Sequence, residues 1–325
     1  MSMTDLPQDE PVFKRLALIG VGNIGSSIAR AVKQAGNAAA HLAAFDRDPA
    51  VRARLLELGI VDSVHESAGE AVTGADGVVL CAPVGAYAGI MPEIAPHLEQ
   101  GAVLTDIGSV KLAVVRDVAP LVPEGVHFVP GHPVAGSEKS GPDAGFAELF
   151  RGRFWLLTPE EGVDPAATAK IEALWSRVGA IVEVMNAAYH DKVLALTSHL
   201  PHLIAYTIVG TAFDVEEQER KDVIRFSAGG FRDFTRIAGS DPTMWRDIFL
   251  NNKEAVLEML QRFTEDLTAL QRQIRWGEGD KLYEFFERTR EVRRGVVEAH
   301  QEGTNPWGGP DANGNKATSE GGKPE

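Results

Sequence analysis

The chain has 325 residues, of which 44% are hydrophobic and 24% are charged, and its formal net charge is −14 at pH 7. This length and composition are typical of a globular protein with room for two domains. The negative charge leaves no basic face, which argues against nucleic acid or an anionic membrane as a partner. Cys81 is the only cysteine, which excludes an internal disulfide and a cysteine-rich metal site, and no metal is expected.

We expect neither a signal peptide at the N-terminus nor a segment that spans a membrane. Residues 1–15 are acidic and lack the apolar core of a signal peptide. The longest apolar region, Leu200 to Phe213, is too short and too interrupted to span a bilayer, so we expect a cytoplasmic protein. We expect residues 1–12 to be flexible and residues 302–325, which lack apolar periodicity, to be disordered.

The first chemical signal is a glycine-rich turn between a strand and a helix. Residues 13–19 form an apolar run that predicts a buried parallel strand, and residues 26–35 have helix-forming composition up to Gly36. In a dinucleotide-binding fold, glycines in such a turn allow a tight bend, approach of the pyrophosphate and close packing of helix on strand. The helix N-terminus then faces the phosphates. The predicted cofactor contacts here are Gly20, Gly22, Asn23, Ile24 and Gly25.

A second predicted strand, residues 41–45, ends at Asp46 about twenty residues after the glycines. A carboxylate at this position binds the ribose hydroxyls of the adenosine, and it repels the extra phosphate of NADP. The sequence therefore favours NAD, although the neighbouring Arg47 could accept such a phosphate. A surface Asp in an unrelated turn is the alternative. Ala82 and Pro83, after a predicted strand at 77–81, complete the cofactor site.

The pattern continues as alternating strands and helices up to residue 185. Helices are predicted at 51–58, 66–72, 90–98, 111–121 and 167–178, and further strands at 102–104 and 126–129. This alternation predicts a Rossmann-type doubly wound parallel sheet over 13–185. Residues 154–157 and 181–184 are expected to be added edge strands.

After residue 185 the strand signals end and apolar residues recur at helical spacing. Helices are predicted within 190–213, 215–226, 242–276 and 279–300, which makes residues 186–301 an all-helical second domain. Long helices with wide apolar faces in so small a domain often pack against a second subunit. We therefore expect a homodimer.

Polar residues follow two strands of the predicted sheet. His132 lies in a loop after the strand at 126–129 and the turn Pro130-Gly131, and Ser137 lies further along that loop. Loops at the carboxyl ends of parallel strands hold the chemistry of α/β enzymes, so we interpret His132 as a catalytic acid or base facing a nicotinamide. Ser109, in the loop one strand earlier, could orient this imidazole or bind substrate, or it could cap the next helix.

The helical domain offers further candidates. His190, His199 and His202 fall within thirteen positions of one apolar segment, interrupted by Pro201, which favours a site over a set of core histidines. Their spacing does not suit one metal ion. The glycine-hinged loop at 229–236 leads to Arg236, whose anionic partner could be Asp233, Asp241 or a substrate carboxylate.

Taken together, these motifs resemble the prephenate/arogenate (cyclohexadienyl) dehydrogenase family. The resemblance covers about 16–300 and rests on four segments in the family's order: 106–111, 131–141, 198–202 and 233–247. It implies an NAD-dependent oxidative decarboxylation of prephenate to 4-hydroxyphenylpyruvate in tyrosine biosynthesis, or of arogenate to tyrosine. It further implies His132 as the catalytic histidine and Ser109 as its assistant. The implied substrate contacts are His202 and Arg236, with Ser137, His190 and Trp245 as supporting residues.

Substrate choice and two rival functions stay open at the sequence level. Residues 185–189 contain no acidic side chain to meet the ammonium of arogenate, which favours prephenate, with dual use as the alternative. A β-hydroxyacid dehydrogenase would rely on a lysine, with Lys192 as the candidate, and would leave the His-Pro segment unexplained. A non-catalytic NAD sensor would retain the fold without the polar site residues.

Overall fold

The computed structural model describes residues 10–136, 139–214, 222 and 225–296. These residues fall into two compact units, one that ends at Leu260 and one that begins at Gln261. The predicted disordered tail and residues 1–9 lie outside the described part. Val12, in the segment expected to be flexible, is buried, and its N–H donates to the Asn37 carbonyl. The domain boundary expected after residue 185 stays a prediction.

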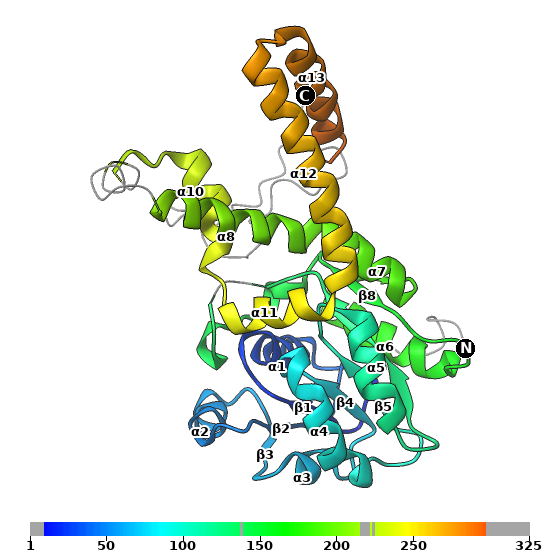
Figure 1. Cartoon of the computed structure of the whole chain (residues 1–325). Helices are drawn as coiled ribbons and strands as arrows, with labels where there is room; N and C mark the ends of the chain where they lie inside the picture. Colours follow the sequence, from blue (N-terminus) through cyan, green and yellow to red (C-terminus); the bar gives the residue numbers. More distant parts are fainter. Residues whose placement is uncertain (1–9, 137–138, 215–221, 223–224, 297–325) are drawn as a thin grey trace, which may run out of the picture. The chain divides into compact units, whose positions relative to one another are not determined.

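A six-stranded parallel sheet forms the centre of the first unit (Figure 1). Its order is β3-β2-β1-β4-β5-β6, and every neighbouring pair is parallel. Because the order reverses between β1 and β4, the carboxyl ends of these strands border the crevice where dinucleotides bind. The predicted doubly wound sheet is confirmed. The strands are β1 (Leu16–Ile19), β2 (Leu42–Phe45), β3 (Ser63–Val64), β4 (Gly77–Leu80), β5 (Val103–Asp106) and β6 (His127–Val129).

Helices connect these strands close to the predicted positions. The helix after the glycine turn ends because Gly36 adopts φ 74°, a left-handed conformation that favours glycine. Ser67 caps the third helix and Asp48 the second, each through a side chain that accepts a backbone N–H. The helices are α1 (Asn23–Ala35), α2 (Pro49–Leu58), α3 (Ala68–Val72), α4 (Tyr87–Ile94), α5 (Lys111–Val118) and α6 (Pro165–Arg177).

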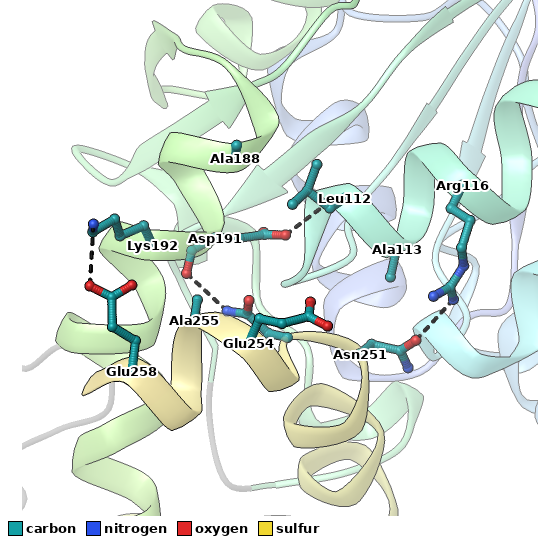
Figure 2. A pocket seen from close by; sticks show the side chains of 11 residues that line it. Leu112, Ala113, Arg116, Ala188, Asp191, Lys192, Asn251, Glu254, Ala255 and Glu258 are labelled. Atoms are coloured by element: carbon teal, nitrogen blue, oxygen red, sulfur yellow. Dashed lines mark hydrogen bonds and ion pairs between the residues drawn. The ribbon is translucent and has the colours of Figure 1, made fainter. Parts of the chain in front are cut away.

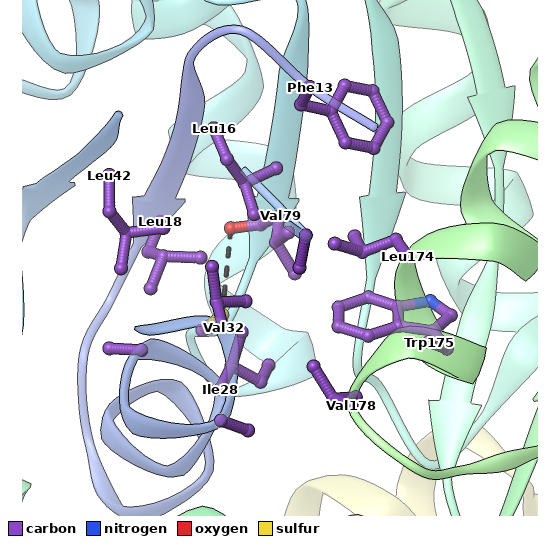
Figure 3. Close-up of a cluster of buried hydrophobic side chains, with 14 of the residues drawn as sticks. Phe13, Leu16, Leu18, Ile28, Val32, Leu42, Val79, Leu174, Trp175 and Val178 are labelled. Atoms are coloured by element: carbon purple, nitrogen blue, oxygen red, sulfur yellow. Dashed lines mark hydrogen bonds between the residues drawn. The ribbon is translucent and has the colours of Figure 1, made fainter. Parts of the chain in front are cut away.

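One face of the sheet packs on α1 and α6 to form the larger core cluster (Figure 3). Leu16 and Leu18 of β1 meet Ile28 of α1, while Leu174 and Trp175 come from α6; all five are fully buried. Burying one such side chain stabilises the fold by roughly 2–3 kcal/mol. This packing holds the start of α1 rigidly at the end of β1.

Three short strands form a separate sheet of order β7-β8-β9: β7 (Gly131–Pro133), β8 (Phe154–Leu157) and β9 (Ile181–Val184). The prediction that the last two are added edge strands of the main sheet is therefore wrong. His132 is in strand β7, antiparallel to β8, and not in a loop. The chain leaves the main sheet at Pro130, which has no N–H to donate and whose carbonyl accepts from Thr158 N–H of the second sheet.

The chain after residue 186 is helical where it is described, as predicted. The helix predicted at 215–226 lies mostly outside the described residues, and the loop predicted at 229–236 is a helix followed by a 3₁₀ turn. A π-helical segment, Ala195–His199, separates the first two helices before Pro201. The helices are α7 (Ala187–Leu194), α8 (Leu200–Phe213), α10 (Gly229–Thr235), α11 (Pro242–Asn251), α12 (Lys253–Trp276) and α13 (Gly279–Val296).

By length and composition alone, the segment Ala187–Phe213 could cross a membrane. It nevertheless carries the buried polar side chains of His190, Asp191 and His199. Their hydrogen bonds reach α5 and Asn252, partners that a bilayer would not supply. We therefore assign this segment to the folded first unit.

Candidate active site

The glycine turn has the shape that a dinucleotide requires. Gly20 adopts φ 84°, and a Cβ there would lie 2.8 Å from the Ala82 backbone nitrogen. A Cβ on Gly25 would lie 2.9 Å from the Gly20 carbonyl oxygen, so this glycine allows α1 to pack on the turn. A Cβ on Gly22 would meet no atom within 4 Å. We therefore expect the open space beside Gly22, at the N-terminus of α1, to receive the pyrophosphate.

Asp46 is half-buried at the end of β2 and points back to this turn. Its carboxylate accepts hydrogen bonds from Val21 N–H (2.8 Å) and Asp48 N–H (2.9 Å). These bonds hold the carboxylate beside the glycines. This is the position from which Asp46 was predicted to bind the ribose hydroxyls of the cofactor. Arg47 is exposed next to it, and Ala82 and Pro83 follow β4 on the other side of the turn.

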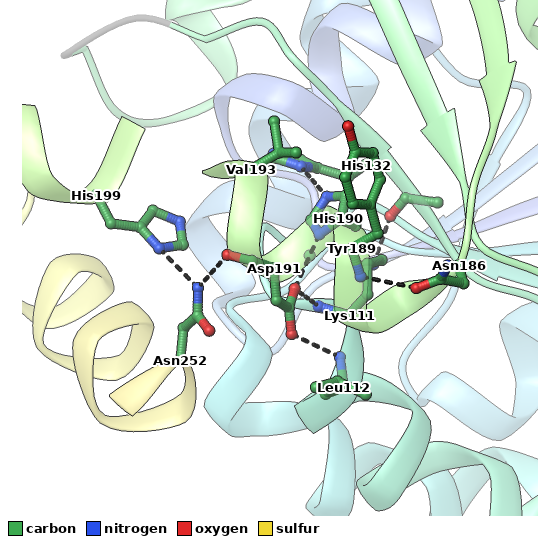
Figure 4. A network of polar contacts seen from close by, with 12 residues as sticks. Lys111, Leu112, His132, Asn186, Tyr189, His190, Asp191, Val193, His199 and Asn252 are labelled. Atoms are coloured by element: carbon green, nitrogen blue, oxygen red, sulfur yellow. Dashed lines mark hydrogen bonds and ion pairs between the residues drawn. The ribbon is translucent and has the colours of Figure 1, made fainter. Parts of the chain in front are cut away.

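His132 belongs to a buried chain of hydrogen bonds (Figure 4). Its Nδ1 lies 2.8 Å from Nε2 of His190, whose Nδ1 lies 2.8 Å from Oδ1 of Asp191. The His132 residue is 8% exposed and the other two are at most 1% exposed. We call these three residues the His–His–Asp relay.

The relay determines which nitrogen of His132 carries the proton. The Asp191 carboxylate accepts from His190 and from the N–H groups of Lys111 and Leu112, so it acts only as an acceptor. His190 must therefore be protonated on Nδ1, and its Nε2 accepts from Nδ1–H of His132. The second nitrogen of His132, Nε2, then carries the free lone pair that can accept a proton.

The same carboxylate caps α5. Val110 occupies the N-cap position without a side-chain bond, and Asp191 instead accepts from the first two N–H groups of the helix, at 2.7 and 2.9 Å. The alternative that Ser109 caps this helix is therefore wrong. Ser109 is half-buried in the turn between β5 and α5, and its contact with His132 stays a prediction.

The surroundings keep these imidazoles neutral. Burial, then the neighbouring His190 and Lys111, lower the pKa of His132 well below its usual value. Burial lowers the pKa of His190 too, although the hydrogen bond to Asp191 opposes this. Burial also lowers the pKa of His199 to about 4. Neutral imidazoles suit proton acceptance.

A second group of candidates gathers at the start of α8 and α11. His202 stacks on Trp245 with ring centroids 3.6 Å apart, and its Nδ1–H donates to the Ser198 carbonyl (2.8 Å). Burial lowers the pKa of His202, the hydrogen bond to the Ser198 carbonyl opposes this, and the positive charge of Arg236 lowers the pKa further. Asp241 caps α11 ahead of Pro242, as that sequence predicts.

His199 connects the two groups. Its ring meets Trp245 edge-on with centroids 6.0 Å apart, and its Nδ1 accepts from the Asn252 side-chain amide at 3.1 Å. The π-helical segment lies between His190 and His202 and interrupts the α-helix that was predicted within 190–213. Such segments often occur at functional sites.

Some candidates lie elsewhere. Lys192 is more than half exposed and pairs with Glu258 at 3.5 Å. Both line a surface cavity of about 360 Å³ between α5, α7 and the start of α12, and this cavity contains no side chain of His132 or His190 (Figure 2). Ser137 lies outside the described residues. The described residues contain no group of three or more possible metal ligands.

Sequence reasoning missed four site residues: Asp106, Lys111, Asp191 and Asn252. Asp106 and Lys111 stand at the two ends of the loop after β5 that contains the candidate Ser109. Two charged residues at the end of a predicted buried strand could therefore have been recognised as site candidates. Asp191 follows His190 directly, but adjacent helical residues do not share a face, and its link to α5 spans 80 positions. Asn252 carried no signal at all.

Comparisons with known proteins identify the family of this chain. Residues 28–184 match the family model described as prephenate dehydrogenase, nucleotide-binding domain, and residues 186–288 match the one described as prephenate dehydrogenase, dimerization domain. A cyclohexadienyl dehydrogenase from Zymomonas mobilis is 42% identical over 289 residues, covering 89% of this chain and 98% of that protein. A prephenate dehydrogenase from Bacillus subtilis is 33% identical over 282 residues, covering 86% and 76%.

Solved structures give the same result. Prephenate dehydrogenase from Aquifex aeolicus in complex with hydroxyphenyl propionate and NAD⁺ aligns with a TM-score of 0.81 at 34% identity, covering 87% of this chain and 98% of that one. Arogenate dehydrogenase from Synechocystis aligns with a TM-score of 0.73 at 25% identity, covering 87% and 99%. The chain belongs to the prephenate dehydrogenase family.

Proposed function

We propose that this protein catalyses the NAD-dependent oxidative decarboxylation of prephenate to 4-hydroxyphenylpyruvate, a step of tyrosine biosynthesis in the cytoplasm. The observation that carries the proposal is the His–His–Asp relay, which presents a bare, neutral Nε2 of His132. A dinucleotide turn lies in the same folded unit. A base beside a hydride acceptor is what this reaction needs.

The glycine turn and Asp46 would hold NAD, with Gly22 beside the pyrophosphate and the carboxylate at the adenosine ribose. The chemistry that NAD supplies when bound is hydride acceptance. Nε2 of His132 takes the proton of the ring hydroxyl as hydride leaves the ring carbon that bears this hydroxyl. The ring carboxylate departs as carbon dioxide, and the ring becomes aromatic, which drives the reaction forward. The protein's task is alignment and one well-placed base.

His202, Arg236 and Trp245 are the proposed substrate-binding residues: His202 and Trp245 stack on each other, and Arg236, whose charge acts on His202, carries the positive charge that an anionic substrate needs. Ser109 is proposed to help orient the hydroxyl, and Ser137 to support the pocket. His190 was first expected to line the substrate pocket. Because it is fully buried with both ring nitrogens engaged, we propose that it orients His132 instead.

Dual use of prephenate and arogenate is the second candidate function. The Zymomonas relative, named cyclohexadienyl dehydrogenase, favours it. Against a preference for arogenate, residues 185–189 contain no carboxylate, and Asn186 is engaged as the cap of α7, where it accepts from Tyr189 N–H. We therefore propose prephenate as the preferred substrate.

We further propose that the protein is a homodimer. None of the described residues from 261 to 295 is buried, and α12 and α13 expose large apolar side chains there, including Ile274, Trp276, Phe286 and Val292. Two helices cannot cover such faces by themselves. The match of residues 186–288 to a dimerization domain supports this. Sedimentation velocity of the purified chain tests it, and a purely monomeric species at micromolar concentration would contradict it.

The function is tested by following NADH formation at about 340 nm with prephenate and arogenate in parallel, using wild type and His132→Asn. We expect turnover of prephenate that falls by roughly 10³-fold or more in the variant, because the base is lost. Binding of NAD, measured by calorimetry, should be unchanged. Folded, NAD-binding wild type that turns over neither compound would contradict the proposal and favour an NAD sensor.

A further inference from the structure

Lys111 and Asp106 form an ion pair in the interior of the first unit. Nζ of Lys111 lies 2.6 Å from Oδ2 of Asp106, and both side chains are 0% exposed. Removing two charges from water costs several kcal/mol for each ion, so such a pair is weak evidence for stability alone. Its position at the end of β5 and the start of α5 suggests a role at the neighbouring site.

Both charged groups bind the residue before His132. Nζ of Lys111 donates to the Gly131 carbonyl oxygen (2.5 Å), and Oδ1 of Asp106 accepts from Gly131 N–H (3.0 Å). The second carboxylate oxygen accepts from Gly108 N–H at 2.7 Å, which fixes the carboxylate on its own loop. The donor and the acceptor of one backbone residue are thus held by the same ion pair.

These bonds connect two different sheets. Asp106 ends β5 of the six-stranded sheet, beside the cofactor crevice, whereas Gly131 and His132 belong to β7 of the three-stranded sheet. The approach is close, because a Cβ on Gly131 would lie 3.1 Å from the Asp106 carbonyl oxygen and 3.0 Å from Nε1 of Trp155. The ion pair therefore determines how far the strand of His132 stands from the sheet that carries the cofactor site.

Lys111 also contacts the relay through its backbone, at Asp191. Its backbone N–H donates to Oδ1 of Asp191, so one residue contacts both the strand of His132 and the carboxylate of the relay. The charged and titratable groups that act on His132 are His190 of α7, Lys111 of α5 and His199 of the π-helical segment, while Asp191 of α7 and Asp106 of β5 act on His190. Among them, the positive charge of Lys111 lowers the pKa of His132.

We propose that Lys111 and Asp106 are positioning residues of the reaction, which place the backbone of His132 against the cofactor-bearing sheet. The proposal rests on the proposed function, in which His132 is the base. A misplacement of about 1 Å is enough to cost roughly 100-fold in rate. Neither residue needs to touch the substrate for this.

The test separates positioning from stability with the double variant Lys111→Met/Asp106→Leu. A single replacement leaves an unpaired buried charge and lowers Tm, whereas replacing both partners by apolar side chains often restores stability. We expect the folded double variant to bind NAD normally while kcat falls roughly 100-fold and KM for prephenate changes less. The acid limb of its kcat–pH profile should move to higher pH, because the cation no longer lowers the pKa of His132.

The matched control is the ion pair Lys33–Asp62, in which Nζ also lies 2.6 Å from Oδ1 but both side chains are over a third exposed. The control variant is Lys33→Met/Asp62→Asn. It should leave kcat and the pH profile unchanged. A double variant at Lys111 and Asp106 with wild-type Tm, kcat and acid limb would overturn the proposal. If that variant does not fold, Asp106→Asn keeps the side-chain shape and one acceptor oxygen; because it retains the Lys111 cation, it is judged by kcat and KM for prephenate and not by the acid limb.

A measurement that does not depend on catalysis can test the positioning role separately from the proposed function. Titration of the His132 imidazole by NMR should show a higher pKa in the double variant than in wild type, whether or not prephenate reacts. A His132 imidazole whose chemical shifts and titration are both unchanged from wild type would overturn the positioning role. Failure of wild type to oxidise prephenate, with the shifted titration intact, would instead count against the proposed function alone.

Discussion

At the scale of single residues, Asp191 determines most of the geometry of the relay. Its carboxylate accepts three hydrogen bonds, from His190 and from the first two N–H groups of α5. It therefore fixes the tautomer of one histidine and the N-terminus of the helix that carries Lys111. Tautomer control of this kind is what a buried Asp does for the histidine of a Ser-His-Asp triad.

We predict that Asp191→Asn lowers kcat by roughly 10²- to 10⁴-fold, because an amide can donate to Nδ1 of His190 and reverse the direction of the relay. KM for NAD should change little, since the glycine turn does not touch Asp191. The matched control is Asp117→Asn on α5, whose carboxylate pairs with the exposed Arg116 and makes no contact with the relay. Equal activities of the two variants would contradict the assigned tautomer.

At the scale of secondary-structure elements, the two ends of the glycine turn have different tasks. Gly20 needs its left-handed backbone and lies against Ala82, so any side chain there strains the fold. Gly22 has open space around its Cβ position, so we predict that its lack of a side chain serves the ligand.

We predict that Gly22→Ala retains the Tm of wild type within a few degrees but raises KM for NAD by roughly tenfold or more, since the methyl group occupies the pyrophosphate space. Gly20→Ala, in contrast, should lower Tm clearly. Thermal unfolding and NAD titration of both variants check this. A Gly22→Ala protein with unchanged affinity for NAD would show that the cofactor does not approach this backbone.

Periodicity and turn chemistry were sufficient to predict the elements that depend on local sequence. The strand at Leu16–Ile19, the helix ended by Gly36 and the cap Asp241 before Pro242 all depend on neighbours in sequence. The second sheet was not predictable in this way, because Pro130 turns the chain toward a partner, Thr158, that is distant in sequence. The π-helical segment also escaped, since its register depends on tertiary contacts of His199 and Asn252.

The candidate site shows the same division. His132, His202 and Arg236 stood out as polar residues in otherwise apolar or glycine-rich segments. The pairing of His132 with His190 and the second role of Asp191 join residues 58 and 80 positions apart, respectively. Side-chain hydrogen bonds at such separations depend on the assembled fold and leave no periodic signal in the sequence.

At the scale of the whole molecule, histidines with lowered pKa values make stability depend on pH: His65, directly after β3, and His132, His190, His199 and His202 of the candidate site. The unfolded chain binds protons on these groups near pH 6.5, whereas the folded chain does not. Above pH 6.5 these histidines are neutral in both states and do not make the free energy of unfolding depend on pH. Below pH 6.5 the unfolded chain binds the protons, so the free energy of unfolding decreases as pH falls.

We predict that the free energy of unfolding falls steeply between pH 6.5 and about 4, the folded pKa of His199. This residue alone accounts for about 3 kcal/mol at the lower end. Urea unfolding at several pH values measures the slope. His199→Gln should flatten it, with Gln replacing the acceptor for Asn252. A slope unaffected by this substitution would contradict the neutral, buried state of His199.

The central claim is that His132 is a neutral base whose Nε2 is free, and NMR of ¹⁵N-histidine-labelled protein tests it most directly. With His132→Asn used to assign the signal, the account predicts an imidazole protonated on Nδ1 and bare on Nε2 at pH 7, still neutral well below pH 6.5. A ring protonated on Nε2, or one that is positively charged at pH 7, would contradict the relay and the role of His132 as the base.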